Sequence, residues 1–347
     1  MADASWMLDP IRQIHAQIRA RVVAACESSR PEDMARIAAD GEGDTIYSID
    51  RISEEMLVEL FERQIAASCP ITLIAEGLPG GKLILPRGTA EDQIRWCVIA
   101  DPIDGTRSLM YQKRSGWILT GVAPNRGAHT CLADIELAVQ TELPLVKQHL
   151  CDTLWAVQGN GSFGERLNRL NGETMPLAAC PSRAMGLAHG FSSVSRFFCG
   201  ARDVLAAIDD EIQTAALGVG SDGKAWSFED QYLSSGGQLY ELIMGHDRFL
   251  ADFRPLLGPI LKHRGLAAGL CCHPYDLCTE LIAREAGVMI TDEFGLGLRS
   301  RLNTDANVAW IGYANEHIRA VVEPILHEAL IRYGLINGSR SEFVSKN

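Results

Sequence analysis

The 347-residue chain is longer than a typical single-core domain, and it carries a net charge of -12 at neutral pH. Hydrophobic residues make up 47% of the sequence and charged residues 22%, so we expect a folded globular protein with two lobes. The acidic balance argues against a surface for a nucleic acid polymer, which needs basic side chains to neutralise phosphates. It is compatible with small phosphorylated substrates bound through divalent cations.

The ten cysteines are scattered and form no Cys-x-x-Cys pair, which favours free, buried thiols in a reducing compartment. No apolar run approaches the length of a membrane span, and the N-terminal residues lack a leader pattern. We therefore expect a cytoplasmic protein without a membrane partner.

The first half of the chain predicts two helices and then a series of strands. Apolar residues recur at helical spacing over 9–28 and about 53–68, with a short strand at 45–50. Asp50 then lies between a strand and a helix, where a helix cap is the commoner role and a catalytic group the alternative. A sheet-rich lobe is predicted by apolar runs at 71–75, 97–100, 116–123, 132–139 and 153–157. The glycine-rich stretch 158–164 favours a hairpin loop over a phosphate cradle.

Two of these predicted strands end on carboxylates. Glu76 follows the run 71–75, and Asp101 and Asp104 follow the run 97–100 within Asp-Pro-Ile-Asp-Gly-Thr. Carboxylate oxygens suit a hard cation such as Mg2+, and the proline and glycine restrict the backbone around them. An Asx-type turn that caps a helix is the alternative interpretation.

The second half predicts helices alternating with strands, a pattern typical of α/β structure. Helices are expected over 201–216, from Ser234 onward and over about 315–333, and strands over 246–253, 288–290 and 308–311. Asp276 lies where a further helix starts, and that helix ends at Gly287. A helix N-cap is the alternative role for this aspartate.

Acids therefore occur at four separate strand ends or turns: Asp50, Glu76, Asp101 with Asp104, and Asp276. Two metal ions that share carboxylates can stabilise both the attacking water and the leaving oxygen of a phosphoryl displacement. This arrangement needs several carboxylates from different parts of the fold, which simple helix caps do not.

Two stretches resemble the signatures of the inositol monophosphatase family, within the lithium-sensitive, metal-dependent sugar phosphatase superfamily. They are Asp101-Pro102-Ile103-Asp104-Gly105-Thr106, and Tyr275-Asp276 with the trailing Glu285-Ala286-Gly287. The similarity runs from about residue 10 to 333. It implies a five-layer α-β-α-β-α sandwich of α+β or α/β class, and usually a homodimer. An α+β lobe over 1–185 would carry most metal ligands, and an α/β lobe over 186–347 would carry Asp276 and the substrate-recognition residues.

The resemblance also implies a set of Mg2+ ligands. Glu76, Asp101 and the main-chain carbonyl of Ile103 would hold the ion that activates water. Asp101, Asp104 and Asp276 would hold a second ion that steadies the leaving oxygen. Two ions are expected, or three if a loosely held one binds as well.

Further roles follow from the same resemblance. Thr106, oriented by Asp50, would position or deprotonate the water, which makes Glu76, Thr106 and Asp50 the predicted catalytic residues. The N–H groups of Gly105 and Thr106 would receive the phosphate. Asp252 would bind sugar hydroxyls.

The sequence departs from the family pattern at several points. Gly77 stands where a second acid usually follows the metal-binding glutamate, which bears on a third metal ion. Arg107 follows the first signature and would recognise a second anionic group on the substrate. Tyr275 stands where tryptophan is commoner. The segment 256–272 is longer than expected, and a surface loop is favoured over a lid or a substrate wall.

The expected function is a Mg2+-dependent phosphomonoesterase that hydrolyses a small polyol or sugar phosphate by two-metal activation of water. An inositol phosphate is placed ahead of fructose 1,6-bisphosphate, histidinol phosphate or a 3'-phosphonucleotide. A catalytically weakened relative that binds a phosphorylated ligand without turnover is the other hypothesis. The intact acid set favours the enzyme.

Overall fold

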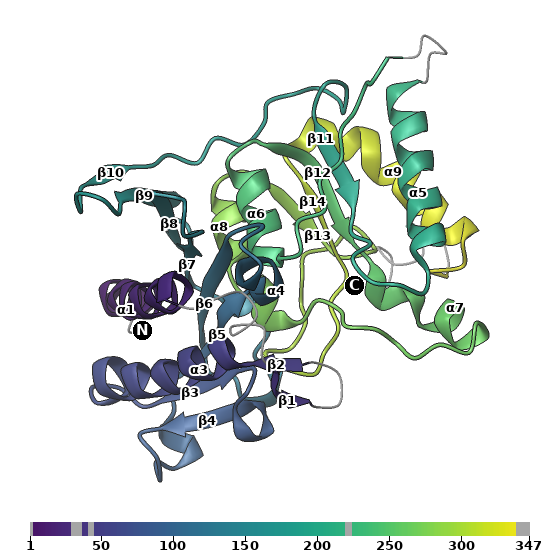
Figure 1. Ribbon diagram of the computed structural model, residues 1–347. Coiled ribbons are helices and arrows are strands. Elements are labelled where there is room, and N and C mark those ends of the chain that lie inside the picture. The colour runs from purple at the N-terminus through teal and green to yellow at the C-terminus, as the bar shows by residue number, and fades with distance from the viewer. Residues whose placement is uncertain (1–2, 29–36, 41–44, 219–223, 338–347) are drawn as a thin grey trace.

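Two large sheets and three layers of helices build the protein, and a two-stranded hairpin forms a third, small sheet (Figure 1). The computed structural model describes residues 3–28, 37–40, 45–218 and 224–337, with side chains of 37–40 and 45–52 outside the description. The larger sheet has the strand order β10-β9-β8-β7-β6-β5-β3-β4. Its strands are β3 (Ile71–Ala75), β4 (Lys82–Leu85), β5 (Trp96–Asp104), β6 (Gly116–Pro124), β7 (Leu137–Leu143), β8 (Leu150–Val157), β9 (Ser162–Asn168) and β10 (Thr174–Pro176).

The first helical layer covers one face of this sheet. Helices α1 (Leu8–Ser28) and α3 (Ser48–Phe61) pack there, and α3 continues as a helical turn over Glu62–Ala66. The apolar stripe of α1 meets alternate residues of the central strands, and the buried members include Ile14, Ile18, Leu73, Val98 and Val122. A short hairpin of β1 (Ile37–Asp40) and β2 (Thr45–Tyr47) precedes α3.

The middle layer lies between the two sheets. Helices α6 (Ser235–Ile243) and α8 (Glu280–Glu285) pack on the opposite face of the larger sheet, against Ile74, Cys97 and Ile99. These residues alternate with those of the first core, as the period of two in a strand requires. Because both faces are covered, β5 is buried along its whole length.

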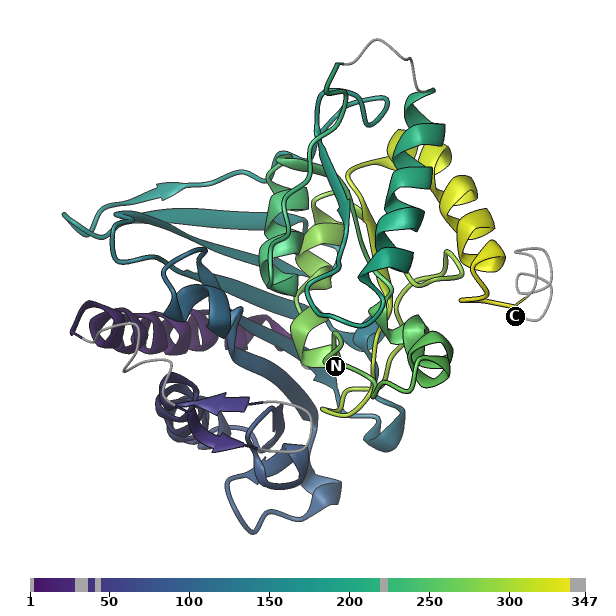
Figure 2. The same ribbon diagram turned by 45° about the vertical axis from the view of Figure 1, so that its right-hand side comes forward.

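The smaller sheet and the last helices complete the sandwich. The order is β11 (Phe191–Val194), β12 (Asp247–Asp252), β14 (Trp310–Tyr313) and β13 (Met289–Thr291). Its outer face packs against α5 (Arg202–Leu217) and α9 (Glu316–Arg332), which run side by side (Figure 2). The five layers confirm the predicted α-β-α-β-α fold class. The boundary between lobes at residues 185 and 186 stays a prediction.

Some predicted elements differ from the structure. The predicted strand 97–100 extends through Asp104, and the 132–139 run becomes a 3-10 turn before β7 starts at Leu137. Asp50 lies in the first turn of α3 rather than before a helix, and its side chain is outside the described ones. The glycine-rich stretch forms the β8–β9 hairpin, as predicted.

The cysteines and the remaining short elements complete the description. All ten cysteines are free, and five of them are buried. The shorter elements include the helices α4 (Thr106–Met110) and α7 (Gly258–His263) and a 3-10 turn over Pro274–Leu277. Within the described residues, every helix falls short of the length or apolar character that crossing a bilayer demands.

Candidate active site

The sheet brings Glu76 and Asp101 to the same edge. Strands β3 and β5 are parallel, and Ala75 pairs with Ala100. The residues that follow this pair, Glu76 and Asp101, are therefore neighbouring acids at the carboxyl ends of the two apolar runs. The sequence pattern of two strands that end on carboxylates predicted this neighbourhood.

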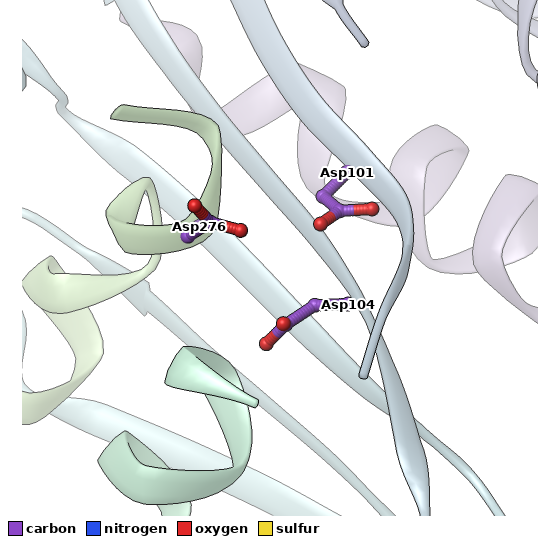
Figure 3. Close-up of side chains that lie close together, drawn as sticks. All are labelled: Asp101, Asp104 and Asp276. Atoms are coloured by element: carbon purple, nitrogen blue, oxygen red, sulfur yellow. The ribbon is translucent and has the colours of Figure 1, made fainter. Parts of the chain in front are cut away.

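A bulge in β5 places Asp101 and Asp104 on one side. Asp101 pairs with Leu119 of β6 and Asp104 pairs with Trp117, so three steps on β5 oppose two on β6. In a regular strand, side chains three positions apart face opposite sides of the sheet. The extra residue of the bulge brings Asp101 and Asp104 to the same side. The sequence predicted a turn here, whereas the bulge allows the strand to present both carboxylates (Figure 3).

Asp276 reaches the same point from the 3-10 turn Pro274–Leu277, where its Oδ2 accepts a hydrogen bond from the His273 N–H at 2.6 Å. One carboxylate oxygen from each of Asp101, Asp104 and Asp276 lies within 4.8 Å of the other two. Figure 3 shows the three side chains pointing toward one another from two separate elements. The three predicted aspartate ligands therefore meet in space.

Burial and mutual repulsion make this cluster electrostatically unfavourable without a cation. Burial, followed by the charges of Asp104, Asp276 and Glu76, raises the pKa of Asp101 well above its usual value. Burial and the charge of Asp104 likewise raise the pKa of Asp276. The pKa of Asp104 rises to about 6 because of its burial, although hydrogen bonds to its carboxylate oppose the shift.

The donor set fits a hard divalent cation. Asp101 Oδ1 accepts the Ile103 N–H at 2.9 Å, and His273 fixes one oxygen of Asp276. Among the described residues, the second oxygen of each of these two carboxylates has no hydrogen-bond donor. Oriented carboxylate oxygens without donors are the ligands that Mg2+ and similar ions bind.

The start of α6 fixes Asp104, and sequence reasoning missed this role. Asp104 Oδ2 accepts the Ser234 hydroxyl at 2.8 Å and the Gly236 N–H at 2.6 Å. A Cβ on Gly236 would lie 3.0 Å from that oxygen, so glycine permits the close approach. The available signal was a capping serine followed by two glycines in the first turn of a helix, where glycine is otherwise unfavourable.

The other residues of the first signature line the same cavity as the three aspartates. They are Pro102, Ile103, Gly105 and Thr106, and the neighbouring Arg107 and Glu76 line it as well. The Thr106 hydroxyl donates to the Ile103 carbonyl at 2.8 Å. Gly105 has a φ of 85°, in the left-handed region, and a Cβ there would lie 2.9 Å from Ser234 Cβ.

Asp252 does not line this cavity. It is fully buried at the end of β12, and the Arg254 guanidinium contacts both of its oxygens, with Nε–Oδ1 at 2.8 Å and Nη2–Oδ2 at 2.5 Å. Arg254 itself lines the cavity, and its guanidinium carbon lies 4.8 Å from the ring centroid of Phe197 and 5.2 Å from that of Phe198. The aspartate expected to bind sugar hydroxyls therefore pairs with an arginine that faces the cavity instead.

Glu54 is a cavity residue that sequence reasoning did not single out. A Cβ built on Gly77 would lie 2.2 to 2.3 Å from the Glu54 carboxylate, so this carboxylate occupies the space that a side chain at position 77 would need. Glu54 lines the cavity with Glu76 and the three aspartates. Nothing in the spacing of the sequence connects α3 with the turn after β3.

The long segment 256–272 contributes to the site as well. It contains α7, and its last residues, Leu270, Cys271 and Cys272, line the cavity. The favoured interpretation as a surface loop is therefore wrong for this end of the segment, which forms a wall.

Comparisons with known proteins agree with this architecture. No family model and no curated protein matches the sequence. Solved structures do match, including the extragenic suppressor protein SuhB of Bartonella henselae, with a TM-score of 0.62 and 14% identity over 92% of this chain and 98% of that one. Fructose-1,6-bisphosphatase of Leishmania major has a TM-score of 0.67 and 13% identity over 94% of each chain. An IMPase of Thermotoga maritima has a TM-score of 0.58 and 18% identity over 93% of this chain and 99% of that one.

These structures span nearly the whole of both chains, so the protein has the fold of the inositol monophosphatase and fructose-1,6-bisphosphatase structures. The resemblance inferred from the two signatures is confirmed at the level of the fold. The roles of individual site residues rest on the geometry described above and on the sequence pattern.

Proposed function

We propose that the protein is a metal-dependent phosphoric monoester hydrolase that acts on a small phosphorylated compound. The observation that carries this proposal is the convergence of Asp101, Asp104 and Asp276 within 4.8 Å, in a cavity that Glu76 also lines. Hydrolases of this class need such a set of shared carboxylates. The similarity to structures named as an IMPase and a fructose-1,6-bisphosphatase supports the same class.

Mg2+ is the proposed cofactor, with the ligands that the family resemblance implies. Glu76, Asp101 and the Ile103 carbonyl would bind one ion, and Asp101, Asp104 and Asp276 a second. Bound Mg2+ would supply positive charge to the phosphate and the leaving oxygen and would make water a better nucleophile. Glu54 replaces the acid that is absent at position 77 and would serve a third, weaker site.

The chain's own groups would orient the reactants. The Thr106 hydroxyl donates a hydrogen bond to the Ile103 carbonyl, which fixes its direction in the cavity, and it would position or deprotonate the attacking water. The N–H groups of Gly105 and Thr106 stay the predicted phosphate contacts. The proposed role of Asp50 as the partner of Thr106 concerns a side chain outside the described ones.

The substrate class proposed from the sequence is a polyol or sugar phosphate, with bisphosphates, histidinol phosphate and 3'-phosphonucleotides as alternatives. The second acid that the family usually has at position 77 is replaced here by glycine, but the Glu54 carboxylate occupies the same space. This substitution therefore gives less support to the hypothesis of a catalytically weakened relative. A homodimer and a cytoplasmic location remain predictions.

A phosphate-release assay tests the proposal. Purified protein is stripped with EDTA and assayed on inositol 1-phosphate, fructose 1,6-bisphosphate, histidinol phosphate and adenosine 3',5'-bisphosphate, with and without Mg2+. We expect release from at least one substrate only when the metal is present. Absence of metal-dependent release from all of them, with calorimetric binding of one still measurable, would favour the ligand-binding relative.

A further inference from the structure

Gln140 is a fully buried polar side chain on the face of β7 that packs against the middle helical layer. It pairs with Leu119 of β6 and Leu154 of β8, and it lies two residues after Ala138, which belongs to the apolar core of the same face. A buried amide costs free energy unless its donors and its acceptor are hydrogen-bonded. A leucine at this position would avoid that cost, so the partners of the amide indicate what it is for.

The Gln140 amide joins two segments that are far apart in the sequence. Its Nε2 donates to the Gly236 carbonyl of α6 at 2.7 Å, and its Oε1 accepts the Thr279 hydroxyl at 3.1 Å. The Gly236 carbonyl can only accept, so the amide nitrogen must face it and the amide oxygen then faces the hydroxyl. Thr279 is fully buried as well. The amide therefore links the start of α6 to the residue that precedes α8.

Each of the two linked segments holds one aspartate of the acidic cluster. The Gly236 N–H donates to Asp104 Oδ2 at 2.6 Å, so the residue whose carbonyl Gln140 binds also orients this carboxylate. Asp276 lies three residues before Thr279, in the 3-10 turn Pro274–Leu277. Figure 3 shows the two aspartates pointing toward one another. The distance between them therefore depends on how the start of α6 and this turn are placed over β7.

Two glycines let both segments lie close against the larger sheet. A Cβ on Gly236 would lie 2.6 Å from Leu119 Cδ2, and a Cβ on Gly121 of β6 would lie 2.7 Å from the Cys278 carbonyl oxygen. Close packing of this kind sets how deeply each segment sits, but apolar contact has no direction. The hydrogen bonds of Gln140 supply the direction, because they fix a carbonyl of one segment and a hydroxyl of the other.

We propose that Gln140 is a positioning residue for the metal centre, which holds Asp104 and Asp276 at the separation that one metal ion requires. The inference rests on the proposed function, because it concerns the second Mg2+ ion proposed above. Gln140 acts through Gly236 and Thr279. Mg2+ demands near-ideal octahedral geometry, so a small shift of one ligand lowers its affinity. Groups that orient metal ligands typically contribute about 10-fold to 100-fold in metal affinity.

Urea unfolding at increasing Mg2+ concentration measures this role without relying on turnover. A metal ion that binds only the folded protein raises the unfolding free energy according to its concentration and dissociation constant. Gln140→Met replaces the amide by an adaptable apolar side chain of similar length. We expect the apparent dissociation constant for Mg2+ to rise about 10-fold, at the lower end of the usual range because Gln140 acts on Asp104 through one intervening residue.

The same substitution at two threonines separates positioning from stability. Thr279→Val removes the hydroxyl that bonds Gln140, and Thr141→Val removes a hydroxyl that bonds His15 Nδ1 at 3.0 Å on the other face of β7. Both threonines are buried, so both variants should unfold at lower urea concentration. Only Thr279→Val should weaken Mg2+ binding, by about 3-fold or more, and Thr279→Ser, which keeps the hydroxyl, should retain the affinity of the unaltered protein.

The phosphate-release assay separates this inference from the proposed function. Metal-dependent release with unchanged Mg2+ affinity in Gln140→Met and Thr279→Val would refute the positioning role and uphold the phosphatase. Weaker Mg2+ binding in these variants, but not in Thr141→Val, supports the positioning role even if no substrate releases phosphate. Equal weakening in Thr141→Val would indicate a general effect of lost stability and overturn the role. If Mg2+ does not stabilise the unaltered protein, the role is refuted, and the phosphatase is refuted with it only where metal-dependent release is absent too.

Discussion

The replacement Asp101→Asn tests whether the acidic cluster lowers the stability of the metal-free protein while it serves to bind metal ions. The asparagine keeps an oxygen that accepts the Ile103 N–H, so the local hydrogen bond survives. The replacement removes one negative charge from the cluster of three aspartates, in which one oxygen of each carboxylate lies within 4.8 Å of the other two. We expect phosphate release to fall at least 100-fold, since the proposed shared ligand of both ions would be lost, while the metal-free protein becomes more stable.

The size of the stabilisation follows from the distances. Two charges 4.8 Å apart repel by about 3.5 kcal/mol at an effective dielectric constant of 20. Partial protonation already relieves some of this repulsion because the pKa values are raised, so we expect a gain of about 2 kcal/mol in unfolding free energy at pH 8. A raised carboxyl pKa destabilises the fold above that pKa, and the penalty disappears as pH falls toward the unfolded value. The gain should therefore shrink between pH 8 and pH 4.

The assay is urea unfolding with EDTA and with saturating Mg2+. Unaltered protein should gain stability on addition of Mg2+, and Asp101→Asn should lose most of that response. Asp152→Asn is the matched control, because this carboxylate is also buried but is held by Arg166 at 2.7 Å and by the Tyr240 hydroxyl at 2.6 Å. Removing a paired charge should cost about 2–3 kcal/mol. If both variants destabilise the metal-free protein equally, the cluster is not under the repulsion inferred here.

Three further predictions concern residues around the site and in the core. Glu54→Gln should weaken the half-saturation by Mg2+ about 10-fold in the phosphate-release assay, as loss of one charged ligand implies, whereas Glu55→Gln, at its exposed neighbour, should not. Ser234→Ala removes a hydrogen bond to Asp104 and a helix cap, and should lower the unfolding free energy by about 1–2 kcal/mol in urea. Buried His15 has its pKa lowered to about 3 by burial, so unfolding binds a proton between pH 6.5 and 3 and stability falls as pH falls, by up to about 1.4 kcal/mol per unit. His15→Gln should remove that part of the slope measured by urea unfolding.

The larger elements could be predicted because their apolar periodicity is strong. Helix α1 begins and ends within a residue of its predicted bounds, and the buried strand before Asp101 follows from an unbroken apolar run. The convergence of Glu76 with Asp101 follows from strand ends that carry acids, and the parallel pairing of β3 and β5 supplies the contact. These features depend on local sequence, which is why one sequence suffices.

Features that depend on packing between distant segments were missed. The β5 bulge has no local signal beyond a proline, and the sequence predicted a turn instead. Glu54 reaches the cavity because Gly77 lacks a side chain. This contact joins α3 to the turn after β3, and no sequence pattern indicates it. Asp252 falls near the family position for a sugar-binding acid, but the nearby Arg254 forms an ion pair with it. In each case a neighbour in space, and not a neighbour in sequence, determines what the side chain does.

The charges that line the acidic cavity imply that a phosphate would bind there only together with metal ions. The described lining carries five carboxylates, on Glu54, Glu76, Asp101, Asp104 and Asp276, and two guanidinium groups. One of these, on Arg254, is already paired with Asp252. A phosphate dianion placed beside this excess of negative charge would be repelled unless divalent cations came first or entered with it.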